Sequence, residues 1–441
     1  MQRATTWAKR HASVFAPSKF QLTHHTRRRL VADLDRQIQV GQTVIHPSTS
    51  SKYLVVTLDP ALNWKQHIQN LTVKISKSIG ALASLAGSTW GAGVNELRKI
   101  YQAVIIPQMM YGCSVWSVAH EHGEGYTKQT ICSLKSLQAK AAKIIGGAYK
   151  ATSGPALDVE LHLLPIEHQI WKTSAETISR ILSSDRMPTL AGFHLLRTTR
   201  SRWRKEPYLS PLEHTYRRLR QRRGASIEDQ EVIPPFLVPP WWQGPIVRIA
   251  SCAEKARTQH KEFLKHPSNS LFVYTDGSGI NNHVGAAAVS PLTRYTKLVY
   301  MGDSETSTVY AAELQGIRLA LQIVDEDAER GNKKDRLIIF TDNQAAIRTF
   351  QKPTGRSGAY IVADAIQLID KLQGDRGTRV ELRWVPAHTG IWGNEAADRA
   401  AKRATKQNAG AGRENENAIQ TRTYYLQATL KTWVKRQTRA E

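Results

Sequence analysis

The chain has 441 residues, 41% of them hydrophobic, which is more than one core ordinarily supports and predicts two or three domains. Its 61 basic and 37 acidic side chains leave a formal charge of +24, which favours a polyanionic partner. Three scattered cysteines without a CxxC pair argue against a disulfide framework and a zinc knuckle. No uncharged apolar run reaches the roughly 18 residues that span a bilayer.

The basic charge is concentrated in the first part of the chain. Residues 1–270 hold 37 basic and 18 acidic side chains, a net of +19, whereas residues 271–406 hold 18 and 16. This asymmetry predicts a basic clamp followed by a region that keeps its acids, with a merely solubilising surface as the alternative. The acid-poor start also allows a mitochondrial transit peptide. We expect instead an intracellular protein of the nucleus or cytoplasm, neither secreted nor bound to a membrane.

In the first half of the chain, the spacing of apolar residues predicts one strand followed by helices. Apolar residues alternate over 52–64 and are interrupted at Asp59-Pro60, which indicates a strand and a turn. Apolar residues then recur at helical spacing in four stretches, 67–85, 95–106, 133–145 and 161–181. Residues 200–245 are rich in Pro and Arg and are typical of a linker. Their basic run, 217–223, is either a nuclear-entry or nucleic-acid patch or a solvated helix face.

From Leu271 the pattern changes to strand, hairpin, helix, strand, helix, strand and helix, which predicts a compact α/β unit. Two of its strands run into similar words, VYTDGS around Asp276 and IFTDNQ around Asp342. A carboxylate that follows a buried strand lies at the carboxyl edge of the sheet, where α/β folds bind ligands. By strand alternation, both aspartates are expected to face one crevice. The alternative for either alone is an ordinary Asp turn.

Glu313 is a third acid of this region. It lies three residues after Tyr310 and four before Ile317, on the apolar face of a predicted helix, so its carboxylate is expected to point toward the sheet. Burying a charge without a partner is costly, so an acid in this place indicates a cation. The alternative is a glutamate at the edge of the stripe that extends to solvent.

The last acid follows a Gly-rich loop in AHTGIWGNEAADRAA, residues 387–401. We expect Asn394 to cap the helix that follows, with Asp398 four residues inside it. Four carboxylates at one place repel one another without a cation, and hard oxygen ligands select Mg²⁺ or Mn²⁺. Two such ions about 4 Å apart can activate a water and hold the leaving oxygen of a phosphodiester. The sequence therefore predicts a metal-dependent phosphodiesterase site.

The motifs TDGS, AAEL, FTDNQ and HTGIWGNEAAD, in this order, resemble type 1 ribonuclease H over residues 269–406. The resemblance implies a mixed five-stranded α/β sheet flanked by helices, and cleavage of the RNA strand of RNA–DNA hybrids. It also implies two Mg²⁺ ions, with Mn²⁺ as a substitute, and no organic cofactor. The metal ligands carried over are Asp276, Glu313, Asp342 and Asp398. Asp276 would bridge both ions, with Glu313 and Asp342 on one side and Asp398 on the other.

The resemblance also assigns His388 to a mobile loop, where it would assist proton transfer or product departure. Ser278, Asn343 and Gln344 lie beside the carboxylates and are candidates for hydrogen bonds to ribose 2′-hydroxyls. Asn394 is a further candidate for substrate binding.

Four stretches of the first half, at 15–29, 52–68, 101–116 and 160–170, resemble the part of non-LTR retrotransposon reverse transcriptases that follows the polymerase aspartates. This likeness accounts for the basic start without a transit peptide. The family usually has Gly where Val55 stands. No Asp-Asp dipeptide occurs in the chain, so we expect a truncated retroelement protein that does not extend primers.

These resemblances predict five segments: the end of a polymerase palm (1–60), a helical thumb-like region (61–200), a basic Pro-rich linker (201–268), the ribonuclease H domain (269–406) and a tail with a short helix (407–441). Two other functions stay open. One is a catalytically inactive remnant that binds nucleic acid. The other is an integrase or another relative with different carboxylate geometry, against which the stretch from His388 to Asp398 and the position of Glu313 argue.

Overall fold

The computed structural model describes residues 2–25, 36–40, 42–87, 90–117, 127–184, 210–224, 229–265, 269–406 and 424–440. The chain divides into two compact units, one of residues 1–174 and 209–215, the other of residues 175–208 and 216–441. None of the described helices is long and apolar enough to cross a membrane. Parts of the predicted thumb (185–200), linker (201–209 and 225–228) and tail (407–423) lie outside the described residues, as do residues 26–29.

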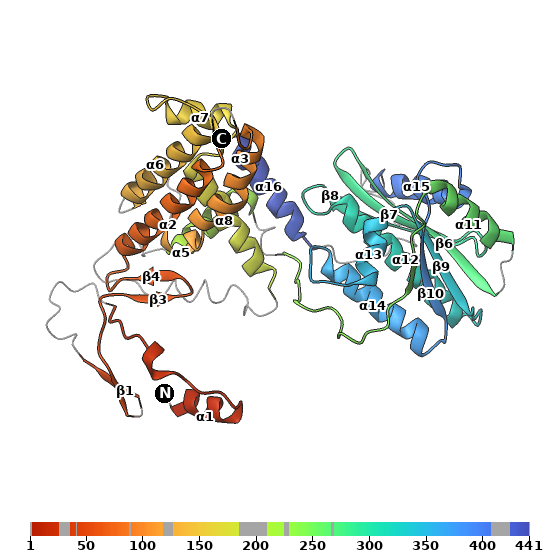
Figure 1. Cartoon of the computed structure of the whole chain (residues 1–441). Coiled ribbons are helices and arrows are strands. Elements are labelled where there is room, and N and C mark those ends of the chain that lie inside the picture. Colours follow the sequence, from red (N-terminus) through yellow and green to blue (C-terminus); the bar gives the residue numbers. More distant parts are fainter. Residues whose placement is uncertain are drawn as a thin grey trace. The chain divides into compact units, whose positions relative to one another are not determined.

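The first unit is mainly helical (Figure 1). Helix α2 (Lys65–Ala83) packs on α6 (Thr127–Ile145), and its buried residues follow the predicted helical spacing from Ile68 to Leu82. The helix predicted at 95–106 is interrupted by a π turn, because α3 (Val94–Ile100) is followed by η2 (Tyr101–Ile105) and α4 (Ile106–Met109). The remaining helices are α1 (Gln2–Arg10), η1 (Pro17–Lys19), α5 (Cys113–Trp116), α7 (Gly154–Glu160) and α8 (Ile166–Leu182), of which α8 runs on into the second unit.

The single strand predicted from residue 52 onward is two short strands in the structure. Strands β3 (Ser51–Tyr53) and β4 (Val56–Leu58) form an antiparallel hairpin, as do β1 (Ile38–Val40) and β2 (Thr43–Ile45). Leu54 and Val55 form the β3–β4 turn with φ of 45° and 72°. This left-handed conformation favours glycine and disfavours a β-branched side chain, which gives a physical reason for the glycine that the resemblance leads us to expect where Val55 stands. The predicted turn at Asp59 is confirmed, because its carboxylate accepts hydrogen bonds from three backbone N–H groups that follow it.

The second unit contains a six-stranded mixed sheet in the order β5-β10-β9-β6-β7-β8 (Figure 1). Strands β5, β10, β9 and β6 are parallel, and β7 and β8 continue the sheet antiparallel, as the predicted hairpin requires. The strands are β5 (Ile246–Arg248), β6 (Ser270–Ile280), β7 (His283–Val289), β8 (Thr296–Asp303), β9 (Arg336–Thr341) and β10 (Arg379–Trp384).

Helices cover both faces of this sheet, and strand alternation divides the core between them. On one face α12 (Val309–Glu329), α13 (Gln344–Gln351) and α14 (Ala359–Gly374) pack on a cluster that includes Val273 and Ile339. On the other face α11 (Ala253–Lys265) and α15 (Trp392–Lys406) meet the aromatic side chains of Phe272, Tyr274 and Phe340.

The α/β fold class is confirmed, and the sheet has one strand more than expected. Strand β5 and helices α10 (Pro211–Arg223) and α11 fall in the segment predicted to be a linker. Strand β5 pairs with β10 along only three residues, so it is too short to show a period-two pattern in the sequence. The basic run 217–223 belongs to α10. At the other end, the expected short helix is α16 (Gln427–Ala440).

Candidate active site

Asp276 and Asp342 occupy equivalent positions beside each other, at the level where the adjacent parallel strands β6 and β9 stop pairing. The last register pair of β6 and β9 is Thr275 with Thr341, and each aspartate is the next residue. Asp342 follows the end of β9, as predicted. Asp276 does not end its strand, because β6 continues to Ile280 and pairs Asp276 with Ala287 of β7. The parallel part of the sheet ends at this level while the hairpin continues, which places both carboxylates beside a step in the sheet edge.

Glu313 reaches this step because helix α12 approaches β6 very closely. Thr308 caps the helix, and its hydroxyl accepts a hydrogen bond from Ala311 N at 3.2 Å. A Cβ atom on Gly277 would lie 2.5 Å from Glu313 N. Only glycine therefore allows the helix to pack at this distance. The glycine of the TDGS motif serves this close contact inside a strand and does not form the turn that an Asp-Gly pair usually indicates.

The ligand atoms of Asp276, Glu313 and Asp342 lie within 4.8 Å of one another. Asp276 and Glu313 are 7% and 5% exposed. Burial, followed by the charges of Asp342 and Asp398, raises the pKa of Asp276 to about 7, against the opposing charge of Lys402. Burial, followed by the charge of Asp276, raises the pKa of Glu313 to about 9. Burial also raises the pKa of Asp342. The three acids thus lie where their ionised forms need a cation.

A divalent cation fits these residues. Glu313 Oε2 is buried and has no hydrogen-bond partner among the described residues, so one oxygen of the cluster lacks the contact that a buried anion requires. Carboxylate oxygens are the donors that Mg²⁺ and Mn²⁺ prefer.

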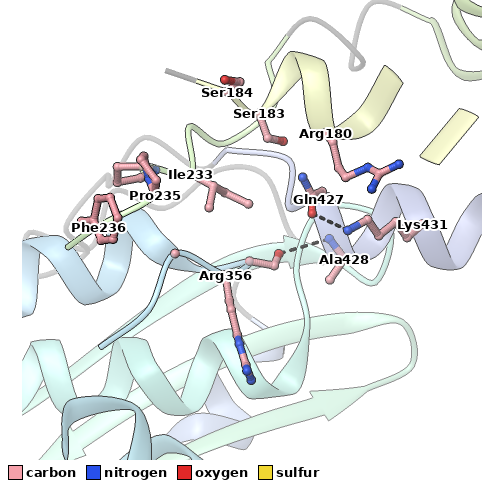
Figure 2. A pocket seen from close by; sticks show the side chains of 13 residues that line it. Arg180, Ser183, Ser184, Ile233, Pro235, Phe236, Arg356, Gln427, Ala428 and Lys431 are labelled. Carbon is pink, nitrogen blue, oxygen red and sulfur yellow. Dashed lines mark hydrogen bonds between the residues drawn. The ribbon is translucent and has the colours of Figure 1, made fainter. Parts of the chain in front are cut away.

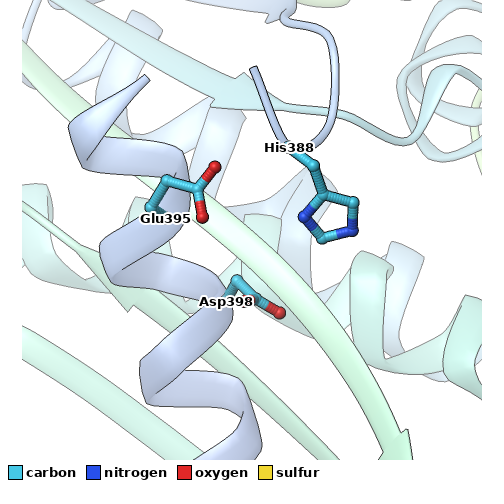
Figure 3. A group of neighbouring side chains, drawn as sticks. All are labelled: His388, Glu395 and Asp398. Atoms are coloured by element: carbon cyan, nitrogen blue, oxygen red, sulfur yellow. The ribbon is translucent and has the colours of Figure 1, made fainter. Parts of the chain in front are cut away.

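A second group consists of His388, Glu395 and Asp398, whose ligand atoms also lie within 4.8 Å of one another. Figure 3 shows the two acids on successive turns of α15, with the His388 ring on the loop that faces them. His388 is exposed and has φ of 50°. Lys402 Nζ lies 2.8 Å from Asp398 Oδ2, one helical turn away. This group is more open than the first and has its own cation.

The four predicted carboxylates are therefore arranged as three plus one. Asp398 is grouped with His388 and Glu395, but its charge still raises the pKa of Asp276 and Asp342, so it acts electrostatically on the first group. Glu395 was not predicted. Its signal is present in the sequence, because residues three apart on a helix share a face and Glu395 precedes Asp398 by three.

Asn394 supports the first group in a way the sequence did not indicate. Helix α15 begins at Trp392, so the prediction that Asn394 is its N-cap is wrong. Asn394 is 3% exposed, and its Nδ2 donates to Asp342 Oδ2 at 3.4 Å. This hydrogen bond lowers the pKa of Asp342, against the larger effect of burial. Asn394 thus stabilises the ionised form of that carboxylate.

The other predicted substrate contacts lie around the carboxylates. Asn343 is the N-cap of α13 and accepts a hydrogen bond from the backbone of that helix at 3.0 Å, and its side chain also lowers the pKa of Glu313. Gln344 Oε1 accepts from Arg348 Nη2 at 3.2 Å. Ser278 is 8% exposed in β6. Their contact with a substrate stays a prediction.

Comparisons with known proteins assign a family to this part of the chain. Residues 268–406 match the family model for RNase H, and this segment is an RNase H domain. A solved structure of LC11-RNase H1, isolated from compost by a metagenomic approach, covers 32% of this chain and 99% of its own, with 17% identity and a TM-score of 0.26.

Two curated relatives come from Drosophila melanogaster. A putative 115 kDa protein in the type-1 retrotransposable element R1DM is 24% identical over 131 residues, which are 27% of this chain and 12% of that protein. A probable RNA-directed DNA polymerase from transposon X-element is 22% identical over 179 residues, which are 41% of this chain and 19% of that protein. The chain thus matches less than a fifth of the length of either relative. Both names are those of retroelement proteins, as the resemblance in the first half predicted.

Proposed function

We propose that the RNase H domain at residues 268–406 hydrolyses the RNA strand of RNA–DNA hybrids with the help of two divalent metal ions. The observation that carries this proposal is the buried cluster of Asp276, Glu313 and Asp342, in which Glu313 Oε2 lacks any hydrogen-bond partner among the described residues. Such a cluster lowers the stability of the fold unless a cation compensates its charge. A binding surface without catalysis does not require it.

The residues would divide the work by position. Asp276 would contact both ions, Glu313 and Asp342 the first, and Asp398 the second. When bound, the ions would supply an activated water and charge stabilisation at the leaving oxygen. Asn394 orients the Asp342 carboxylate through its hydrogen bond. His388, exposed on its loop, is placed to exchange protons with the reacting strand or the departing product.

The names of the two relatives support a wider proposal for the chain. We infer that it is part of a non-LTR retrotransposon protein, in which the basic region 1–270 grips the nucleic acid by salt-sensitive phosphate contacts. Without an Asp-Asp pair in this chain, we expect no primer extension by it.

The test is cleavage of an RNA–DNA hybrid labelled on the RNA strand, by the full chain with Mg²⁺. We expect cleavage of the RNA strand and none of double-stranded DNA or double-stranded RNA. Asp276→Asn should reduce cleavage below detection and leave hybrid binding measurable. Asp327→Asn is the matched control, since Asp327 is 3% exposed on the same helix as Glu313 but is hydrogen bonded to Asn332.

Substantial cleavage by Asp276→Asn would overturn the assignment of the site. If the unaltered chain binds hybrid tightly but does not cut it with Mg²⁺ or Mn²⁺, the inactive nucleic-acid-binding remnant becomes the better description.

A further inference from the structure

A pocket of about 750 Å³ lies within the second unit, outside the carboxylate site. Its walls are the last turn of α8, the segment 233–236, the loop 355–357 and the first turns of α16 (Figure 2). Its lining residues are basic, hydroxyl-bearing, amide or apolar, and none of those that the structure describes is acidic.

Among the described residues, the hydrogen-bond partners of two cations of this pocket, Arg180 and Lys431, are neutral. Arg180 Nη2 donates to Thr177 Oγ1 at 3.1 Å, and Lys431 Nζ donates to Gln427 Oε1. Neither makes an ion pair with any residue in the described part of the chain. Burial lowers the pKa of Lys431, and the charge of Arg180 lowers it further, against smaller opposing effects of Glu176 and Glu231. The two cations therefore repel each other, and an anion bound between them would relieve this repulsion.

A buried hydroxyl without a partner among the described residues agrees with an anion site. Ser183 is 1% exposed, lines the pocket, and its Oγ has no hydrogen-bond partner among the described residues. It can donate to an anion oxygen. The carboxylate of Glu231 does not accept the Ser183 hydroxyl. It accepts hydrogen bonds from Ser357 Oγ and from the backbone N–H groups of Gly358 and Gln427 instead.

Arg356 also belongs to a neighbouring pocket that is lined by basic side chains. Arg356 lines both this pocket and a neighbouring one of about 520 Å³, and Figure 2 shows its guanidinium extending away from Arg180 and Lys431. The neighbouring pocket is lined by Arg348 and Lys352 of the α13 region and by Ala345. Ala345 follows Asp342 by three residues. Basic side chains thus line both pockets, and the second pocket includes a residue close in the sequence to Asp342.

We infer that Arg180, Lys431 and the Ser183 hydroxyl bind a phosphate group in the backbone of the hybrid, beyond the part held at the carboxylates. A guanidinium, an ammonium and a hydroxyl are the groups that proteins use for phosphodiester oxygens, and they hold the strand without reading its sequence. This inference rests on the proposed function, because it takes the same hybrid as its ligand.

The test compares binding of a short hybrid of about 8 base pairs with binding of a long one of about 30 base pairs, in an Asp276→Asn background that prevents cleavage. Arg180→Gln combined with Lys431→Gln should weaken binding of the long hybrid roughly tenfold and reduce the slope of log K against log salt by about one unit, because one phosphate contact is lost. Binding of the short hybrid should be unchanged. Arg257→Gln combined with Lys261→Gln is the matched control, since it removes the same charge from exposed positions on α11.

An equal loss for the control pair, an equal loss on both hybrids, or no loss on the long hybrid would each overturn the site. If the double variant does not fold, Arg356→Gln replaces it, because Arg356 is exposed and should cost roughly two- to threefold on the long hybrid only. Failure of the proposed function is separately visible. If the unaltered chain cuts no hybrid but the Arg180 and Lys431 variant still loses affinity, the phosphate site stands and the proposed function fails. If the unaltered chain cuts hybrid and the variant keeps its affinity, only the phosphate site is overturned.

Discussion

The two acidic groups of the RNase H domain contain similar side chains in different surroundings. Asp276, Glu313 and Asp342 lie between a sheet and a closely packed helix, and two of them are under 10% exposed. His388, Glu395 and Asp398 lie on a loop and an open helix face, with Lys402 paired to Asp398. Burial makes the first group depend on an external cation to compensate its charge, whereas Lys402 already compensates part of the charge of the second. The effect of a substitution should therefore follow burial more than chemical type.

The largest difference is expected between Glu313→Gln and Glu395→Gln, which make the same chemical change in the two groups. Glu313→Gln should reduce cleavage by roughly a thousandfold or more, because a metal ligand loses its charge. It should also raise the melting temperature in EDTA at neutral pH, because the amide, unlike the carboxyl group, does not ionise in the unfolded chain and so does not favour unfolding. Cleavage rates and thermal melting measure both effects. Retained cleavage with a lowered melting temperature would contradict the comparison.

The next largest effect concerns pH and metal removal. The pKa values of Asp276 and Glu313 in the folded state, about 7 and about 9, lie above their ordinary values of 3.8 and 4.5. The folded protein therefore binds protons more tightly than the unfolded chain, and its stability falls as pH rises through these windows. We expect the melting temperature in EDTA to fall by several degrees between about pH 5 and pH 9.

Saturating Mg²⁺ should remove most of this slope, because the ion stabilises the ionised carboxylates. Glu313→Gln should also flatten the slope in EDTA, and Glu395→Gln should leave it as it is. A melting temperature in EDTA that rises over this pH range would show that the buried group does not behave as described.

A smaller effect is expected for His388→Ala. The side chain is exposed and is not one of the three buried ligands, so its loss should slow cleavage by roughly ten- to a hundredfold without abolishing it. The concentration of Mg²⁺ that gives half-maximal cleavage should stay within about twofold. If His388→Ala were as inactive as Asp276→Asn, the loop would belong to the essential site.

The smallest effect is expected for Glu395→Gln, at roughly two- to threefold in cleavage rate, because Asp398 keeps Lys402 as its counter-ion. The same assay measures it. A loss as large as that of Glu313→Gln would show that Glu395 holds an ion as directly as the buried acids do and that burial is not what distinguishes the two groups.

The sequence by itself predicted that Asp276, Glu313 and Asp342 lie close together and which strands and helix carry them. Asp276 and Asp342 were predictable because strand periodicity and similar flanking residues are local patterns, and Glu313 because helical spacing assigns it to the apolar face. Glu395 was also within reach, since its spacing from Asp398 is a local signal. Helix α15, which carries Glu395 and Asp398, was predictable, but its first residue was not. Asn394 resembles an N-cap in the sequence, and in the structure it contacts Asp342 instead.

Only the tertiary structure decided how these residues are grouped. The approach of α12 to Gly277, the burial that raises the pKa of Glu313, and the separation of Asp398 from the first three acids depend on contacts between segments far apart in the chain. The same holds for β5, whose three residues form a strand only because β10 lies beside them. It holds also for the pocket of Arg180 and Lys431, which are about 250 positions apart in the sequence. Local periodicity predicts which face of its element a residue lies on. Distances between residues of different elements depend on how the elements pack, and the sequence of one segment does not contain that information.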